Sequence, residues 1–145
     1  MTYRIREVDA SDEEIAETIK EFNRIECAWP VLTEDELEGD GCHWWLAYDK
    51  EKPIGFAGLT PSQRYPNAGY FKRVLVLPRY RGRQLQSRFF RALERRARAI
   101  GWDMIVSETT NTVYSANNFI RAGYRLFDPE YPWAFSNSLY WKKEL

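Results

Sequence analysis

The part of the chain that most constrains the fold is residues 68–109, which read as strand, turn, helix and strand. Residues 68–77 form a long apolar segment typical of a strand, and an Arg-Gly-Arg turn follows at residues 81–83. The apolar periodicity then predicts a helix to about Ile100, ended by the glycine after it. Residues 104–109 form a second apolar strand. Two strands joined by one helix are expected to be parallel neighbours in a β-α-β unit.

Weaker signals place the remaining elements around this unit. Ser11 and Glu14 form a capping box that starts a helix, and Thr33 caps a short acidic helix. The other predicted elements are a strand at 2–8, a hairpin of strands at 42–48 and 54–60, a short helix at 115–122 and closing strands at 124–127 and 137–141. This order predicts an α+β fold, with a mixed, mostly antiparallel sheet, one parallel strand pair and helices on both faces. We expect residues 1–145 to form a single domain, because the chain has the size of one domain and no linker-like stretch.

Composition argues against several classes of function. The formal net charge is +0, which gives the whole chain no general attraction to nucleic acid, and no apolar run is long enough to span a membrane. One histidine, and two cysteines without metal-ligand spacing, argue against a metal site. We therefore expect free thiols, a cytoplasmic location, and neither a nucleic-acid nor a membrane partner. Aromatic residues make up 16% of the chain, which predicts that some rings line a groove or an interface.

The turn at residues 81–83 has the features of an anion site. It precedes a helix, and a helix N-terminus carries backbone N–H groups without partners and a partial positive charge. Consecutive N–H groups in such a turn form a concavity that binds phosphates. The two arginines of the turn add charge suited to phosphate. Gln84 and Gln86 follow instead of further glycines, and their N–H groups remain usable if φ stays negative, as at a helix start.

Three motifs occur in one order along the chain. The hairpin reads W-W-L-A-Y-D-K-E-K-P-I-G-F-A-G-L, the junction reads V-L-P-R-Y and then R-G-R-Q-L-Q, and the short helix ends in F-I-R-A-G-Y. Together they resemble the GNAT superfamily of acyl-CoA-dependent N-acetyltransferases, over nearly the whole chain. The resemblance implies a GNAT-like fold in which a bulge splays the parallel strand pair. It also implies an N-acetyltransferase that moves an acetyl group from acetyl-CoA to a primary amine by direct attack.

The resemblance implies where coenzyme A binds as well. The pyrophosphate would lie on the turn and the helix start, and the pantetheine arm along the end of the strand before them. The implied cofactor contacts are Val74, Leu75, Val76, Arg81, Gly82, Arg83, Gln84, Leu85, Gln86, Ser87 and Asn117. The chain departs from the family at Gln84 and Gln86, where glycine or alanine is usual. We expect Gln84 to point away from the ligand or to hydrogen-bond to it.

The long central strand lacks the glutamate that some relatives carry there, so the candidate catalytic residues lie elsewhere. Glu108, at the end of its strand and facing the splayed junction, is the first candidate for the base that takes the amine proton, and Glu26 is the second. For both, a solvated or salt-bridged carboxylate is the alternative, with proton transfer through an ordered water. Phe119 replaces a tyrosine that protonates the leaving thiolate in many relatives. The tyrosines that could serve instead are Tyr114, Tyr124 and Tyr131, with water as a further alternative.

The acceptor is expected to be an amine of a small molecule or a protein. Trp29, Tyr131 and Trp133 are candidate contacts to an apolar or aromatic body of this substrate, and rings packed against a sheet edge are the alternative. Two other functions stay open. One is a non-catalytic or regulatory protein on the same fold that binds acyl-CoA or has lost it, and the other is a nucleic-acid-contacting protein that uses the arginines of the long helix. Both a monomer and a homodimer fit the sequence.

Overall fold

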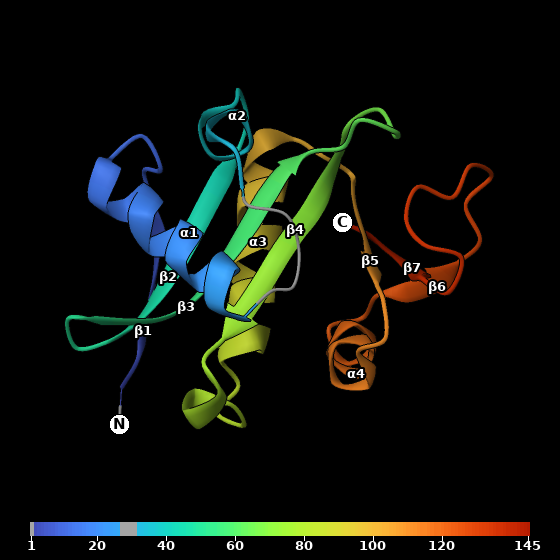
Figure 1. Cartoon of the computed structure of the whole chain (residues 1–145). Helices are drawn as coiled ribbons and strands as arrows, with labels where there is room; N and C mark the ends of the chain where they lie inside the picture. The colour runs from blue at the N-terminus through green and yellow to red at the C-terminus, as the bar shows by residue number, and fades with distance from the viewer. Residues whose placement is uncertain (1, 27–31) are drawn as a thin grey trace.

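The computed structural model describes residues 2–26 and 32–145. The elements are β1 (Arg4–Val8), α1 (Glu13–Glu26), α2 (Glu34–Glu38), β2 (His43–Asp49), β3 (Lys52–Pro61), β4 (Ala68–Val76), the 3₁₀ helix η1 (Pro78–Tyr80), α3 (Leu85–Ile100), β5 (Met104–Thr109), α4 (Val113–Arg121), β6 (Arg125–Phe127) and β7 (Leu139–Glu144). The strands form a 7-stranded sheet in the order β1-β2-β3-β4-β5-β7-β6, in which β4 and β5 are parallel and the other neighbours are antiparallel. Helix α1 lies on one face of the sheet and α3 on the other (Figure 1). The predicted α+β fold is confirmed.

Each face of the sheet buries its own apolar cluster. On the α3 face, Phe71 of β4 packs with Phe89 and Phe90 of α3. Phe119 joins α4 to this cluster, because its ring centroid lies 5.0 Å from that of Phe90 and 5.6 Å from that of Phe71. On the other face, α1 and α2 cover a second cluster that includes Phe56 of β3. The central strands are therefore held from both sides, and α4 is fixed against the α3 face.

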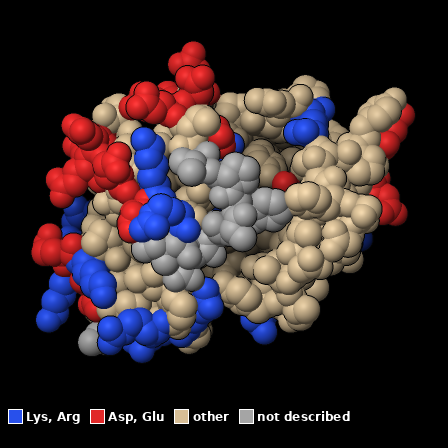
Figure 2. All heavy atoms as spheres, in the orientation of Figure 1, with Lys and Arg blue, Asp and Glu red and all other residues tan. Residues whose placement is uncertain are grey.

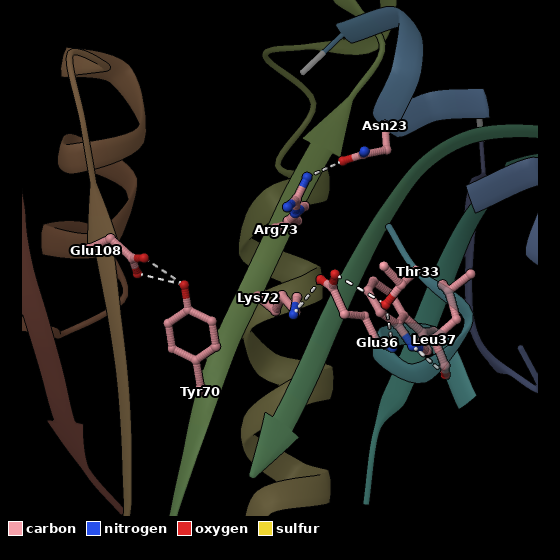
Figure 3. A network of polar contacts seen from close by, with 9 residues as sticks. Asn23, Thr33, Glu36, Leu37, Tyr70, Lys72, Arg73 and Glu108 are labelled. Atoms are coloured by element: carbon pink, nitrogen blue, oxygen red, sulfur yellow. Dashed lines mark hydrogen bonds and ion pairs between the residues drawn. The ribbon is translucent and has the colours of Figure 1, made fainter. Parts of the chain in front are cut away.

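Strand β4 carries a β-bulge near its middle. Its register with β3 shifts at Arg73, which has a φ of 58°. A bulge interrupts the alternation of side chains along a strand. Consequently Lys72 and Arg73 both reach elements on the α1 face: the Lys72 ammonium lies 2.8 Å from a carboxylate oxygen of Glu36 on α2, and Arg73 donates a hydrogen bond to Asn23 on α1 (Figure 3).

The parallel strands β4 and β5 stay together over only part of their length. They pair from Ala68 with Met104 to Tyr70 with Val106. Beyond these pairs β4 continues along β3, while β5 continues along β7, and the two ribbons separate (Figure 1). The splayed strand pair expected from the family resemblance is present.

The start of α1 differs from the prediction. The helix begins at Glu13, and the Asp12 carboxylate accepts the N–H of Ile15 at 3.1 Å. The Ser11 hydroxyl instead donates to the Asp9 carboxylate at 2.6 Å. The predicted capping box at Ser11 is therefore wrong, because an aspartate one residue later takes the capping position.

The closing strands are also shifted toward the C-terminus. Tyr124 lies in the turn that follows α4, where its N–H donates to the carbonyl of Phe119 at 2.9 Å, and β6 begins one residue later. A turn between Phe135 and Ser138 then delays β7, whose last residues pair with the start of β5 in spite of their charge. The prediction ended this strand too early because it relied on apolar residues, whereas backbone pairing extends it to Glu144.

Candidate functional site

A cleft of about 680 Å³ opens where β4 and β5 separate. Val74 and Leu75 of β4 line it from one side and Glu108 of β5 from the other. Helix α4 contributes Tyr114, and the loop after β6 contributes residues 133–135. The cleft is thus a consequence of the strand splay, closed on its outer side by segments that follow β5.

The two ends of the cleft carry different groups. The turn end lies at Arg81 and Tyr114, where β4 passes through η1 into α3. The carboxylate end lies at Tyr70, Glu108 and Trp133, near the start of β4. Because the two ends lie at opposite ends of one strand, an extended ligand in the cleft would contact both.

At the carboxylate end a phenol faces a carboxylate across the splayed strands. The Tyr70 hydroxyl lies 2.6 Å from Oε1 and 2.8 Å from Oε2 of Glu108 (Figure 3). Burial raises the pKa of Tyr70 far above its ordinary value, and the negative charge and hydrogen bond of Glu108 raise it further. The phenol therefore stays protonated and donates, while the carboxylate accepts. This contact orients the Glu108 side chain at the wall of the cleft.

The turn end presents backbone donors. Helix α3 begins at Leu85, and in the described part of the chain no side chain caps its first turn. Its first N–H groups consequently have no intrahelical acceptor and are available to a ligand. Gly82, in the turn before the helix, has a φ of 78°, which suits a glycine.

The Arg81 side chain extends from the turn toward α4. Its Nε donates to the carbonyl of Val76 at 3.1 Å, and its guanidinium lies 5.5 Å from the centre of the Tyr114 ring. These contacts hold a cation at the turn end of the cleft, in the turn that precedes α3. The arrangement offers a diphosphate both charge and backbone donors.

Gln84 adopts a conformation that the sequence did not indicate. Its φ is 61°, in the left-handed region, so the condition of a negative φ is not met at this position. The chain turns there as it would with a glycine, although a side chain in this region costs about 1–2 kcal/mol. The Gln84 side chain is exposed.

Arg83 turns away from the cleft toward the first strand. It hydrogen-bonds to the Tyr3 hydroxyl and lies over the rings of Tyr3 and Tyr80, at 5.9 and 5.8 Å. Arg88 donates to the Tyr3 carbonyl at 2.9 Å. Both arginines thus tie α3 to the segment that enters β1, and Arg81 is the arginine of the turn that lines the cleft.

Gln86 lies buried between α3 and α4. Its Oε1 accepts a hydrogen bond from Nδ2 of Asn118 at 2.8 Å, and its Nε2 has no acceptor among the described residues. Asn117, the predicted cofactor contact, is exposed. The side chain at the place of a family glycine or alanine therefore links two helices instead of entering the cleft.

The cleft gathers some of the predicted site residues. Those that line it are Val74, Leu75, Arg81, Glu108, Tyr114 and Trp133. Those that are described but do not line it are Val76, Gly82, Arg83, Gln84, Leu85, Gln86, Ser87, Asn117 and Tyr131. Trp29 and the side chain of Glu26 lie outside the described residues. Tyr131 is 78% exposed, so the aromatic loop brings only Trp133 to the cleft.

Phe119 and Tyr114 both line the cleft but differ in exposure. Phe119 lines the cleft but is 3% exposed and belongs to the core. Tyr114, at the start of α4, is the exposed phenol of the cleft. Tyr124 is buried, and this burial raises its pKa well above the ordinary value. Of the three tyrosines predicted as alternatives, only Tyr114 lies in the cleft.

The surroundings of the cleft are unevenly charged. Acidic side chains gather over α1 and α2, whereas uncharged side chains predominate on the opposite side of the face shown in Figure 2. The described residues contain no group of three or more metal-ligating side chains. Over the same residues, no helix is long and apolar enough to cross a membrane.

Comparison with known proteins gives a consistent result. The sequence model of the acetyltransferase (GNAT) family matches residues 3–124. No curated protein matches the chain. A Klebsiella pneumoniae structure with an inferred acyl-CoA N-acyltransferase activity is 22% identical, with a TM-score of 0.79 over 99% of this chain and 98% of the other.

Two further structures have the same fold. A GNAT-family acetyltransferase from Staphylococcus aureus is 18% identical, with a TM-score of 0.77 over 99% of each chain. A chain of the NatC complex bound to Gag peptide and CoA is 17% identical, with a TM-score of 0.79 over 100% of this chain and 99% of the other. At these identities the structural likeness shows the fold, and the family model carries the membership.

Proposed function

This chain belongs to the acetyltransferase (GNAT) family, and we propose that it transfers an acetyl group from acetyl-CoA to a primary amine. The observation that carries the proposal is the cleft between β4 and β5, which has Arg81, from the turn before α3, at one end and the Tyr70–Glu108 pair at the other. The proposed acceptor is a small molecule or a protein, and the proposed location is the cytoplasm.

The turn end fits the diphosphate of coenzyme A. The first N–H groups of α3 and the guanidinium of Arg81 would bind its charge. Backbone groups of Val74 and Leu75, on the stretch of β4 that has left β5, would bind the pantetheine arm. When bound, acetyl-CoA supplies the acetyl group as a thioester.

Glu108 is the proposed base. An alkyl amine is mostly protonated near neutral pH and must lose a proton before its nitrogen can form the new C–N bond. The Glu108 carboxylate, held by Tyr70 at the wall of the cleft, would take this proton directly or through a water. CoA leaves as its thiol, and Tyr114 is the phenol of the cleft that would donate the proton to it.

One alternative has specific support. Gln86 is a buried side chain where small residues are usual, and Phe119 has no proton to donate. Both are compatible with a protein that binds acyl-CoA without turnover. In this non-catalytic alternative the protein still binds acyl-CoA but does not transfer the acyl group.

Two measurements test the proposal in sequence. Calorimetry should show binding of acetyl-CoA, and a thiol-release assay across a panel of amines should then show turnover. Binding without release for every amine would favour the non-catalytic alternative. No binding at millimolar acetyl-CoA would overturn the cofactor assignment and the proposed function with it.

A further inference from the structure

A second cavity of about 260 Å³ adjoins the carboxylate end of the cleft. The β3–β4 loop and the two splayed strands form it, and its lining includes Thr60, Ser62, Arg64, Lys72 and Val106. Tyr70 and Trp133 line both this cavity and the main cleft. The two spaces therefore meet at Trp133 and at Tyr70, whose hydroxyl donates to Glu108, and we call the smaller one the side cavity.

The charge of the side cavity is positive. Arg64 and Lys72 line it, and its described lining contains no aspartate or glutamate. The Lys72 ammonium is already paired with Glu36 at 2.8 Å. Arg64 has no ion pair with any residue that the structure describes, and its guanidinium lies 5.1 Å from the centre of the Trp133 ring. Among the described residues, the Arg64 guanidinium at this cavity therefore has no counter-ion.

The neighbouring carboxylate lies a short distance away along β5. Val106, at the side cavity, and Glu108, at the cleft, are two residues apart and so project from the same face of the strand. Two strand residues span roughly 6–7 Å. A molecule with its amine beside Glu108 would therefore have a group several bonds away within reach of the side cavity.

We propose that the acceptor is a small amino acid whose carboxylate binds Arg64 while its amine, several bonds away, faces Glu108. This inference rests on the proposed function, because it names the acceptor of the same reaction. An arginine guanidinium matches a carboxylate with two parallel hydrogen bonds, and the Trp133 ring supports its plane. The arrangement disfavours polyamines, since a second ammonium would enter a cavity that already holds Arg64 and Lys72. Arg64 is a specificity-determining residue in this scheme.

Matched acceptors test the proposal. The pairs are 4-aminobutyrate with n-butylamine, and 5-aminopentanoate with n-pentylamine, which differ in the carboxylate. We expect kcat/KM to favour the amino acid of each pair by about tenfold or more, the usual value of a charge-assisted contact. Arg64→Gln should remove most of this preference through KM with little change in kcat, and Arg64→Lys should restore part of it. Arg125→Gln, at an exposed arginine on β6, is the matched control and should change nothing.

Binding measurements separate the possible failures. Calorimetry with the same pairs on CoA-saturated protein should show the same Arg64-dependent preference, whether or not turnover occurs. Equal binding and equal turnover for both members of each pair would overturn the amino-acid acceptor and leave the proposed acetyl transfer intact. If acetyl-CoA does not bind, the proposed function fails, and an Arg64-dependent preference for 4-aminobutyrate on the protein alone would still support the carboxylate site. The absence of that preference would overturn it.

Discussion

The two ends of the cleft are built from different parts of the polypeptide. The turn end uses the backbone of one continuous stretch, from η1 into α3, with Arg81 beside it. The carboxylate end uses side chains from three distant segments, which meet as Tyr70, Glu108 and Trp133. A backbone site tolerates changes of side chain, whereas a side-chain site depends on each residue. The turn end is therefore suited to a ligand that does not vary, such as the cofactor. The carboxylate end is suited to the recognition of one particular acceptor.

Substitution of Glu108, the proposed base, should have the largest effect. It should lower kcat and leave the binding of acetyl-CoA at the turn end unchanged. Glu108→Gln removes the proposed proton acceptor, so kcat should fall by about 10²–10⁴-fold. The affinity for acetyl-CoA should stay unchanged, because Glu108 lies on β5 and is not part of the turn that would bind the diphosphate. Steady-state thiol release and calorimetry measure the two quantities. Glu130→Gln, at an exposed carboxylate of the aromatic loop, is the control.

If Glu108→Gln weakened acetyl-CoA binding as strongly as it slowed turnover, the assignment of cofactor binding to the turn end and of catalysis to the carboxylate end would be wrong. An unchanged kcat would instead remove Glu108 from the mechanism and favour proton transfer to water.

A change at the turn end should produce the complementary result. Arg81→Ala removes the cation beside the first N–H groups of α3, and the Kd for acetyl-CoA should rise by roughly tenfold or more, as expected for one charge-assisted contact. The value of kcat at saturating acetyl-CoA should change little. Arg79→Ala, at an exposed arginine of η1 outside the cleft, should leave binding unchanged. Equal Kd values for the two variants would contradict a phosphate role for Arg81.

The difference between the ends also explains what the sequence could predict. The turn end was recognisable because its parts are consecutive: a strand, Gly82, the arginines and a helix start. The fold followed from the same local patterns, and its errors fell at boundaries such as Ser11, where a neighbouring capping residue competed. Neither the left-handed conformation of Gln84 nor the turn of Arg83 toward Tyr3 could be read locally, because both depend on how α3 is placed against the sheet.

At the carboxylate end, prediction identified single residues but not their combination. Glu108 was identified as the end of a strand facing the splay, yet its partner Tyr70 was missed. Their meeting depends on the parallel register, in which Tyr70 pairs with Val106, and no local pattern encodes that register. Arg64 was missed for a similar reason, since the β3–β4 loop reaches the site only through the sheet order.

The contribution of the Tyr70–Glu108 hydrogen bond to stability can also be tested, with a smaller expected effect. Its raised pKa means that the unfolded protein loses the phenolic proton from about pH 10 while the folded protein keeps it. The unfolded state then binds fewer protons, so the free energy of unfolding should fall above pH 10, by about 1 kcal/mol per pH unit for this group. Tyr70→Phe should lose stability at neutral pH, because Glu108 loses a hydrogen bond, but should show a shallower alkaline decline.

Urea unfolding between pH 7 and pH 11 measures both effects. Tyr114→Phe, at the exposed phenol of the turn end, is the control, and its alkaline decline should match that of the unchanged protein. A decline in Tyr70→Phe as steep as in the unchanged protein would show that the folded protein does not retain the proton on Tyr70.

Substitution of Gln84 should have the smallest effect. It tests whether the turn end binds its ligand through backbone N–H groups and not through the Gln84 side chain. Its φ of 61° is strained for a residue with a side chain, so Gln84→Gly should raise the free energy of unfolding by up to about 1 kcal/mol after the added flexibility of the unfolded chain is offset. Gly82→Ala is the matched opposite: its φ is 78° and a Cβ there would meet nothing within 4 Å, so conformation alone should destabilise it by a similar amount. Chemical denaturation measures both changes, and calorimetry with acetyl-CoA shows whether the relaxed turn still presents its N–H groups. Gln84→Gly should bind at least as tightly as the unchanged protein, because those donors belong to the backbone. Weaker binding would mean that the Gln84 side chain itself contacts the ligand.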